Sequence, residues 1–211
     1  PRHMKVFKGK LYFQADGGDG KGTELWVYSG SGAPYRFADI CPDDCSSTPT
    51  YLEVFNEKLY FNADGGDGKG SELWVYNGIS SILNIADIYP GPNGSCPEHL
   101  AVFNNKLYFK ANGGDDKGAE LWAFDGENDP YRVADIYPGI PNSYPRYLAV
   151  FNNKLYFSAD SGNGAGRELW AYNGSSDPYL VRDIYPGSPH SNPRYMTVFN
   201  DKLYFLSLIH I

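Results

Sequence analysis

The segment KLYFNADGGDGKGSELWVYNG, residues 58–78, decides the fold of this chain, because the rest of the sequence repeats it or joins its copies. It holds an apolar run, a loop rich in Gly and Asp, and a second apolar run. Its Leu-Tyr-Phe triplet recurs every 48 residues, at Leu11, Leu59, Leu107, Leu155 and Leu203. Its Glu-Leu-Trp triplet recurs at the same spacing, at Glu24, Glu72, Glu120 and Glu168. A fixed period without insertions predicts a repeat architecture.

One repeat has the pattern of four short antiparallel strands. In the second copy the expected strands cover residues 51–55, 58–63, 72–76 and 83–88. Asn, Asp and Gly lie between them, where tight turns need positive φ. The third strand is apolar on both faces, so its sheet must be covered on both sides. Four-stranded sheets packed face to face around an axis meet this requirement, and the sequence predicts an all-β β-propeller with about one blade per repeat.

Composition agrees with this fold and excludes some partners. The 18 Tyr, 12 Phe and 4 Trp, together with 24 Gly and 15 Pro, are typical of short strands and turns, so almost no helix is expected. The net charge of −7 disfavours nucleic acid. No apolar run approaches the roughly 18 residues of a membrane span, so no membrane partner is expected. Cys41 and Cys45 are close enough in sequence to form a disulfide, but their spacing leaves free thiols equally open.

The repeats resemble the ELWxxDGT-type propeller repeats of bacterial surface and secreted proteins. Besides the Glu-Leu-Trp triplets, the resemblance rests on Asp-Ile-Tyr-Pro-Gly connections that begin at Asp87, Asp135 and Asp183. It covers essentially the whole chain but departs at Asp39, where the connection reads Asp-Ile-Cys-Pro-Asp. The resemblance implies a β-propeller and a secreted or cell-surface location, and it implies no settled activity.

The repeat count sets the expected domain organisation. We expect one domain over residues 5–211, with repeats near 5–50, 51–98, 99–146 and 147–194 and a partial repeat over 195–211, because single repeats cannot bury their own apolar faces. Residues 1–4 have the look of a tag remnant and are expected to lie outside the fold. The first two strands occur five times and the last two four times. This predicts five blades with an incomplete last one; the alternative is four blades with a surplus or swapped strand pair. In both cases the unpaired C-terminal strands offer an edge for a homo-oligomer.

The Gly/Asp-rich loops could hold calcium, because clustered carboxylates and flexible backbone carbonyls are the ligands that this cation prefers. The alternative is that the Asp side chains accept hydrogen bonds from nearby amides, and that each repeated Glu accepts them from backbone amides. The candidate metal ligands are Asp16, Asp19, Glu24, Asp64, Asp67, Glu72 and Asp115.

A second set of candidates could bind a sugar, because aromatic rings beside polar groups suit carbohydrate. Tyrosines of the Tyr-Pro-Gly connections and of the first strands would stack on the sugar, and arginines would bind its hydroxyl groups. These residues are Tyr89, Tyr137, Tyr185, Tyr147, Tyr195, Arg146 and Arg194. The alternative is that the connection tyrosines only seal loops against the blades.

The sequence gives little support for catalysis. His99, His190 and His210 lie at non-equivalent repeat positions, and no nucleophile, phosphate-loop or zinc signature accompanies them. We therefore predict a non-enzymatic recognition module that binds glycans at several similar sites, where weak sites gain avidity. The alternative is a structural or protein-interaction propeller, possibly calcium-stabilised. A third hypothesis, an enzyme with a site in the central channel, would require residues that break the repeat symmetry.

Overall fold

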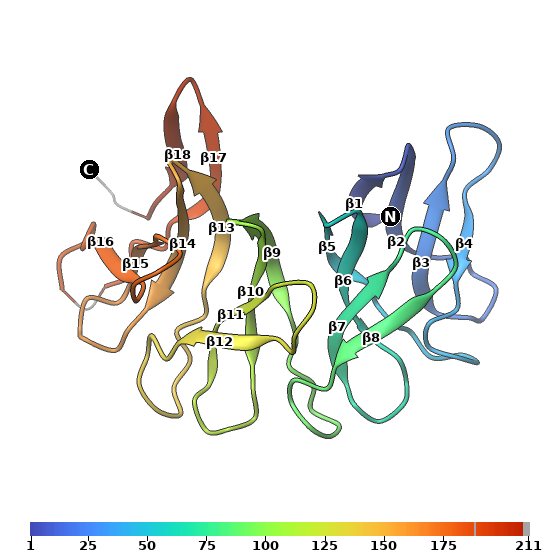
Figure 1. Ribbon diagram of the computed structural model, residues 1–211, viewed down its shortest axis with the longest axis horizontal. Coiled ribbons are helices and arrows are strands. Elements are labelled where there is room, and N and C mark those ends of the chain that lie inside the picture. The colour runs from blue at the N-terminus through green and yellow to red at the C-terminus, as the bar shows by residue number, and fades with distance from the viewer. Residues whose placement is uncertain (188, 209–211) are drawn as a thin grey trace. The chain divides into compact units, whose positions relative to one another are not determined.

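The computed structural model describes residues 1–187 and 189–208 (Figure 1). One of the three histidines considered above, His210, lies outside the described residues. The contacts divide the chain into two compact units, Pro1–Leu100 and Ala101–Ile211, and the single domain expected from the repeats stays a prediction. Each unit is described by itself below.

The described residues form strands and turns only. The strands of the first unit are β1 (Arg2–Phe7), β2 (Lys10–Asp16), β3 (Thr23–Tyr28), β4 (Tyr35–Ala38), β5 (Thr50–Phe55), β6 (Lys58–Asp64), β7 (Ser71–Tyr76) and β8 (Ile82–Ala86). The third repeat contributes β9 (Glu98–Phe103), β10 (Lys106–Asn112), β11 (Ala119–Phe124) and β12 (Tyr131–Ala134). The fourth contributes β13 (Arg146–Phe151), β14 (Lys154–Asp160), β15 (Arg167–Tyr172) and β16 (Tyr179–Arg182), and the last two strands are β17 (Arg194–Phe199) and β18 (Lys202–Leu206).

These strands form four four-stranded sheets and one two-stranded sheet, and neighbours in each sheet are consecutive in sequence. Figure 1 shows each sheet as a meander of this kind. The predicted four-stranded antiparallel blades with an incomplete fifth are therefore confirmed. Residues 2–4, expected outside the fold, instead belong to β1, where Arg2 lies opposite Gln14. No helix in the described part of the chain is long and apolar enough to cross a membrane.

The first strands β1, β5, β13 and β17 carry a β-bulge near their starts. In β13 the register shifts between Arg146 and Ala149, and Tyr147 takes a φ of 57°. The same shift occurs in β17, where Tyr195 has a φ of 53°. A bulge inserts an unpaired residue and re-aims the side chains around it, which is why bulges often border functional sites. The start of each of these four strands is thus a point where the blade can present side chains away from the ladder.

Each unit has its own apolar core between neighbouring blades. In the second unit Phe103, Tyr108, Leu121, Leu155 and Phe157 are buried together, and Trp170 packs with them. In the first unit the equivalent cluster includes Tyr12, Leu25, Leu59 and Phe61. Trp170 and Trp74 of the Glu-Leu-Trp triplets therefore pack into these cores, and burial of these apolar side chains is the main stabilising contribution.

Candidate functional site

The candidate calcium ligands in the loops all have partners within the protein. Asp16 Oδ1 and Asp64 Oδ1 accept hydrogen bonds from the amides two residues later, each at 2.8 Å. Asp19 pairs with Arg36, and Asp115 pairs with Arg132. Asp67 accepts a hydrogen bond from the Lys69 amide at 3.2 Å. Within residues 1–187 and 189–208 no group of three or more His, Cys, Asp or Glu side chains is placed to hold a metal. Calcium binding stays a prediction.

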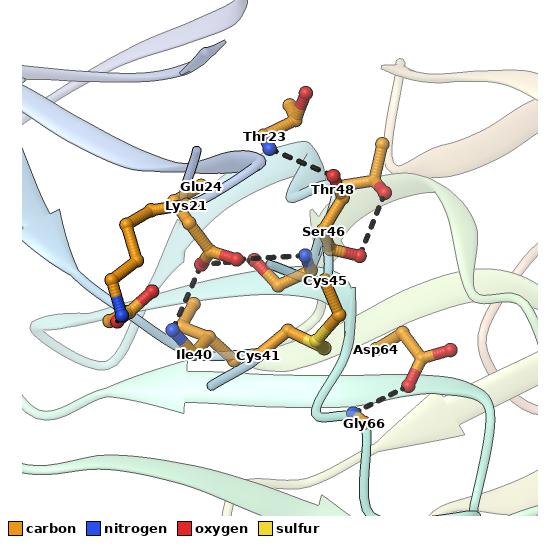
Figure 2. Close-up of a disulfide and its surroundings, with 12 residues drawn as sticks. Lys21, Thr23, Glu24, Ile40, Cys41, Cys45, Ser46, Thr48, Asp64 and Gly66 are labelled. Atoms are coloured by element: carbon orange, nitrogen blue, oxygen red, sulfur yellow. Dashed lines mark hydrogen bonds and ion pairs between the residues drawn. A yellow bond between two sulfur atoms is a disulfide. The ribbon is translucent and has the colours of Figure 1, made fainter. Parts of the chain in front are cut away.

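The repeated Glu residues lie in a different environment from these loops. Glu24, Glu72, Glu120 and Glu168 are all 0 % exposed. The Glu120 carboxylate accepts hydrogen bonds from the Ile136 amide at 2.8 Å, the Ser143 amide at 2.9 Å and the Ser143 hydroxyl at 2.6 Å. The other three make the same contacts with the connection that follows their blade, as Figure 2 shows for Glu24 and the Ile40 amide. Each Glu therefore holds the connection to the next blade. The structure thus shows the alternative given above for these residues, in which each repeated Glu accepts hydrogen bonds from backbone amides.

Burial of these carboxylates makes stability depend on pH. Burial raises the pKa of Glu120 to about 7, although hydrogen bonds from Ser143 oppose the shift. Burial likewise raises the pKa of Glu72 above its ordinary value. An acid with a raised pKa binds its proton more tightly in the folded chain than in the unfolded one. Proton binding by Glu120 therefore stabilises the folded chain at low pH, and this stabilisation is lost as the pH rises from about 4.5 to 7.

We therefore expect Glu120→Gln, which cannot titrate, to reduce the fall in the free energy of unfolding between pH 4 and 8. Urea unfolding of both proteins from pH 4 to 8 measures it, and the relevant quantity is the difference between their free energies of unfolding. That difference should become less favourable to the wild type as the pH rises. A difference that does not change with pH would contradict the assignment.

The connection tyrosines differ in their surroundings. Tyr137 lies against the loop of the next blade, where a Cβ on Gly162 would come within 2.1 Å of its ring. Tyr89 is half-buried and accepts a hydrogen bond from Asn93 at 3.4 Å, whereas Tyr185 is 43 % exposed. Tyr137 thus seals a loop, which is the alternative considered for this set.

A disulfide takes the place of the connection tyrosine in the first blade. Cys41 and Cys45 are bridged, and Cys41 is buried. Figure 2 shows the disulfide beside Gly66, where an added Cβ would lie 2.6 Å from the Cys41 sulfur. The covalent bridge therefore covers the loop of the second blade in the way that Tyr137 covers the loop of the fourth.

Two of the predicted arginines meet in one pocket of the second unit. A cavity of about 160 Å³ is lined by Arg146, Arg167 and Arg194, and also by Tyr147, Ser158, Asn192 and Pro193. We call it the arginine pocket. Of the predicted sugar-binding set it contains Arg146, Arg194 and Tyr147. Tyr195 lies next to it, with its ring centroid 5.2 Å from that of Tyr147. Tyr89, Tyr137 and Tyr185 do not line it.

Neighbouring strand ends bring the arginines together. Arg146 begins β13 beside the bulge and lies opposite Ser158 of β14. Arg167 begins β15, and its amide donates a hydrogen bond to His190 Nδ1 at 2.6 Å. Arg194 begins β17, which contacts β13. Because each arginine starts a strand and has a partner in the ladder, the sheet fixes its backbone beside the pocket.

Positive charge is concentrated in the arginine pocket. The guanidinium carbons of Arg146 and Arg167 lie 5.0 and 5.6 Å from the centre of the same ring, Tyr144. Burial, and next the charge of Arg146, lower the pKa of Arg167, while Asp160 acts in the opposite direction. Among the described residues none of the three guanidinium groups forms an ion pair with a carboxylate.

Two buried polar atoms at the pocket also have no hydrogen-bond partner. They are Arg146 Nε and the hydroxyl oxygen of Ser158, a residue that is 1 % exposed. A buried polar group without a partner costs about 1–3 kcal/mol. Such groups beside uncompensated positive charge indicate a position suited to an anionic acceptor.

Sequence reasoning missed Arg167 and Ser158. Arg167 occupies the position directly before Glu-Leu-Trp, which is held by Thr23, Ser71 and Ala119 in the other repeats. Comparing the repeats position by position would have shown this exception. Within the part of the chain that the structure describes, an arginine directly before Glu-Leu-Trp therefore occurs in the fourth repeat alone, and it adds to the arginines that start β13 and β17.

No family model and no curated protein matches the chain. Among solved structures it is similar to the β-propeller domain of the Trilobed protease from Pyrococcus furiosus, with a TM-score of 0.57 and 12 % identity; the match covers 87 % of this chain and 53 % of that one. It is similar to a prolyl endopeptidase, with a TM-score of 0.55 and 11 % identity, covering 84 % of this chain and 25 % of the other. A family 117 glycoside hydrolase from Zobellia galactanivorans gives a TM-score of 0.47 and 14 % identity, covering 90 % and 71 %.

These similarities correct the predicted function. A non-enzymatic module that binds carbohydrate at several sites was expected because no catalytic signature stood out in the sequence. The similar structures include a protease propeller domain and a prolyl endopeptidase, so chains of this fold do belong to enzymes, and the absence of a signature gave no ground for excluding one. A cavity lined by Arg2, Gln14, Thr23 and Thr48 occupies the equivalent position in the first unit, but it has one arginine where the arginine pocket has three. At these identities the similarity shows the fold alone: the chain is a β-propeller.

Proposed function

We propose that this chain is a β-propeller domain of the ELWxxDGT-repeat type that serves an enzyme by binding an anionic group of a ligand in the arginine pocket. The observation that carries the proposal is the convergence of Arg146, Arg167 and Arg194 on one cavity. Glu-Leu-Trp triplets at a constant spacing support the repeat type. The enzyme context is supported by the protease propeller domain and the prolyl endopeptidase, of which the chain spans about half and about a quarter of the length.

The ligand group is a carboxylate, phosphate or sulfate. Guanidinium groups present fixed pairs of N–H donors that match the oxygens of these anions, and charge-assisted hydrogen bonds of this kind are the strong ones. A cavity of about 160 Å³ is large enough for one such group and the ligand atoms that are bonded to it. The Ser158 hydroxyl and Arg146 Nε would gain in the anion the acceptor that they lack within the protein.

The test is a calorimetric titration of the protein with inorganic phosphate, sulfate or acetate at constant ionic strength. We expect at least one of these anions to bind saturably, and Arg167→Gln to weaken binding at least tenfold because it removes one of the three guanidinium groups that line the pocket. Competition by added chloride should weaken binding further, since exposed charge is screened. The three probes distinguish a planar from a tetrahedral ligand group.

The matched control is Arg182→Gln, which removes one positive charge from an exposed position on β16 of the same sheet. This variant should bind as the wild type does. Saturable binding lost equally in both variants would contradict the proposal, because it would show a response to net charge and not to the pocket. Absence of binding by all three anions would contradict it as well.

A further inference from the structure

The arginine pocket is built mainly on the fourth sheet, in which all four strands are present. Arg146 starts β13, Ser158 lies opposite it on β14, and Arg167 starts β15. Arg194 lines the same cavity from the start of β17. The groups that can donate hydrogen bonds to a ligand therefore come from four strands, and they approach the cavity from several directions.

The equivalent positions of the second blade satisfy one another. There Thr50 and Asn62 take the places of Arg146 and Ser158, and they lie opposite each other in the ladder. The Asn62 side-chain amide donates a hydrogen bond to the Thr50 hydroxyl at 3.2 Å. In the fourth blade the buried Arg146 Nε and the Ser158 hydroxyl have no such partner among the described residues. The fourth blade therefore differs from the second in having both positive charge and unused hydrogen-bonding groups at this place.

The two guanidinium groups of the fourth sheet are held against one ring. Arg146 and Arg167 lie over Tyr144, at 5.0 and 5.6 Å from its centre. The backbone of Tyr144 is fixed in turn, because its amide donates a hydrogen bond to the Ala119 carbonyl at 3.1 Å. Arginines stack well on aromatic faces, and groups held in place before binding lose little conformational freedom when a ligand arrives. The donors of this pocket are therefore arranged in advance.

Charge separates the three candidate ligand groups. A carboxylate and a sulfate ester each carry one negative charge, whereas a phosphate monoester carries about two above its second pKa of about 6. The pocket brings together three guanidinium groups, and none of them pairs with a carboxylate among the described residues. Because Coulomb attraction is proportional to the charge of the ligand, a second negative charge offsets their mutual repulsion better than one does.

Shape favours the same ligand group. A carboxylate is planar and has two oxygens, so it matches a single guanidinium fork best. A phosphate monoester has three terminal oxygens that point in different directions, as donors from four strands require. The pocket also contains uncharged surface, the Tyr147 ring and the buried Pro193, which a bare ion would not use. Such surface suits the organic part of an ester.

We propose, on the basis of the anion site described under the proposed function, that the ligand group of the arginine pocket is the phosphate of a monoester. Its terminal oxygens accept hydrogen bonds from the three arginines and from the Ser158 hydroxyl. The organic part of the ester contacts Tyr147 and Pro193.

The test is a calorimetric titration of the intact protein with methyl phosphate, methyl sulfate or acetate at pH 8 and constant ionic strength. Methyl phosphate and methyl sulfate have the same tetrahedral shape and differ by one negative charge. We expect methyl phosphate to bind at least tenfold more tightly than either of the other two. Phenyl phosphate, titrated in the same way, distinguishes an aromatic ester from an aliphatic one. Tighter binding of either phosphate ester than of methyl sulfate supports the proposal.

Ser158→Ala tests the contact with the hydroxyl. Because this buried hydroxyl has no partner within the described part of the protein, its removal should keep the melting temperature or raise it. It should nevertheless weaken the binding of methyl phosphate about tenfold. The matched control is Ser176→Ala, which removes an exposed hydroxyl from the turn between β15 and β16 of the same sheet. This variant should leave both the melting temperature and the affinity unchanged.

The outcomes separate this proposal from the proposed function. Equal binding of methyl phosphate, methyl sulfate and acetate would overturn the phosphate assignment and leave the anion site standing. Tighter binding of acetate than of methyl phosphate would overturn it in favour of a carboxylate. Binding by none of the probes would contradict both. An affinity for methyl phosphate that is the same in Ser158→Ala as in the wild type would overturn the proposed contact with Ser158.

Discussion

Replacing Glu120 by Ala is expected to lower the free energy of unfolding by about 3–5 kcal/mol, since each buried donor left without a partner costs about 1–3 kcal/mol. The Glu120 carboxylate is 0 % exposed and accepts three hydrogen bonds from the connection that leads to the fourth blade. The alanine variant removes the acceptor but leaves the amides of Ile136 and Ser143 in place. Urea unfolding at pH 7, followed by circular dichroism, measures the loss.

Two further variants separate the acceptor from its donors. Ser143→Ala removes only the hydroxyl that donates to Glu120 and should cost about 1 kcal/mol, the net value of a typical hydrogen bond. Glu127→Ala changes an exposed acid of the same unit and should stay within about 0.5 kcal/mol of the wild type. A loss at Glu120 no larger than at Glu127 would show that the connection is held by other contacts.

The second large effect is expected for Gly118→Ala, with a loss of about 2–4 kcal/mol from left-handed backbone and overpacking together. Gly118 has a φ of 66°, and a Cβ there would lie 2.3 Å from the carbonyl oxygen of Pro141 and 2.8 Å from that of Ile140. Both neighbours are backbone atoms of the following connection, so they cannot turn aside as a side chain would. The same unfolding experiment measures this loss.

Gly164→Ala is the control that measures only the cost of placing alanine in a left-handed backbone conformation, without overpacking. Gly164 has a φ of 89° and no atom within 4 Å of an added Cβ, so its substitution should cost only about 1 kcal/mol. Equal losses at the two positions would mean that the contact with Pro141 contributes nothing. A larger loss at Gly118 would instead show that this loop has a glycine because the following connection packs against it. Calcium binding would then not be needed to account for the glycine.

Much of the fold follows from patterns within one repeat. The alternation along Glu-Leu-Trp and the turn residues between strands predicted four antiparallel strands per repeat, and the structure has them. The count of triplets predicted that the fifth sheet would have only β17 and β18. The disulfide was left open, because the distance between Cys41 and Cys45 depends on how the loop between them turns.

The candidate site was predicted only in part. Arg146 and Arg194 were identified as binding residues at equivalent repeat positions, and they line the same pocket. Arg167 was not predicted, because it is distant in sequence from Arg146 and Arg194 and reaches them only when neighbouring strands pack. The predicted function rested on the lack of a known catalytic signature, but similar structures belong to enzymes, so that lack decides nothing about function.

The sequence by itself determined the strands, their order and the incomplete last sheet, because the hydrophobic period and the turn chemistry are local properties that 48 residues repeat. Tertiary structure alone decided which polar groups share an environment. It placed the buried Glu residues against the connections, separating Glu24 and Glu72 from the loop acids Asp16 and Asp64. It also brought Arg167 beside Arg146 and Arg194, which start three different strands. The physical reason is that charge and burial depend on distances across the sheet, and these are set only when neighbouring blades pack.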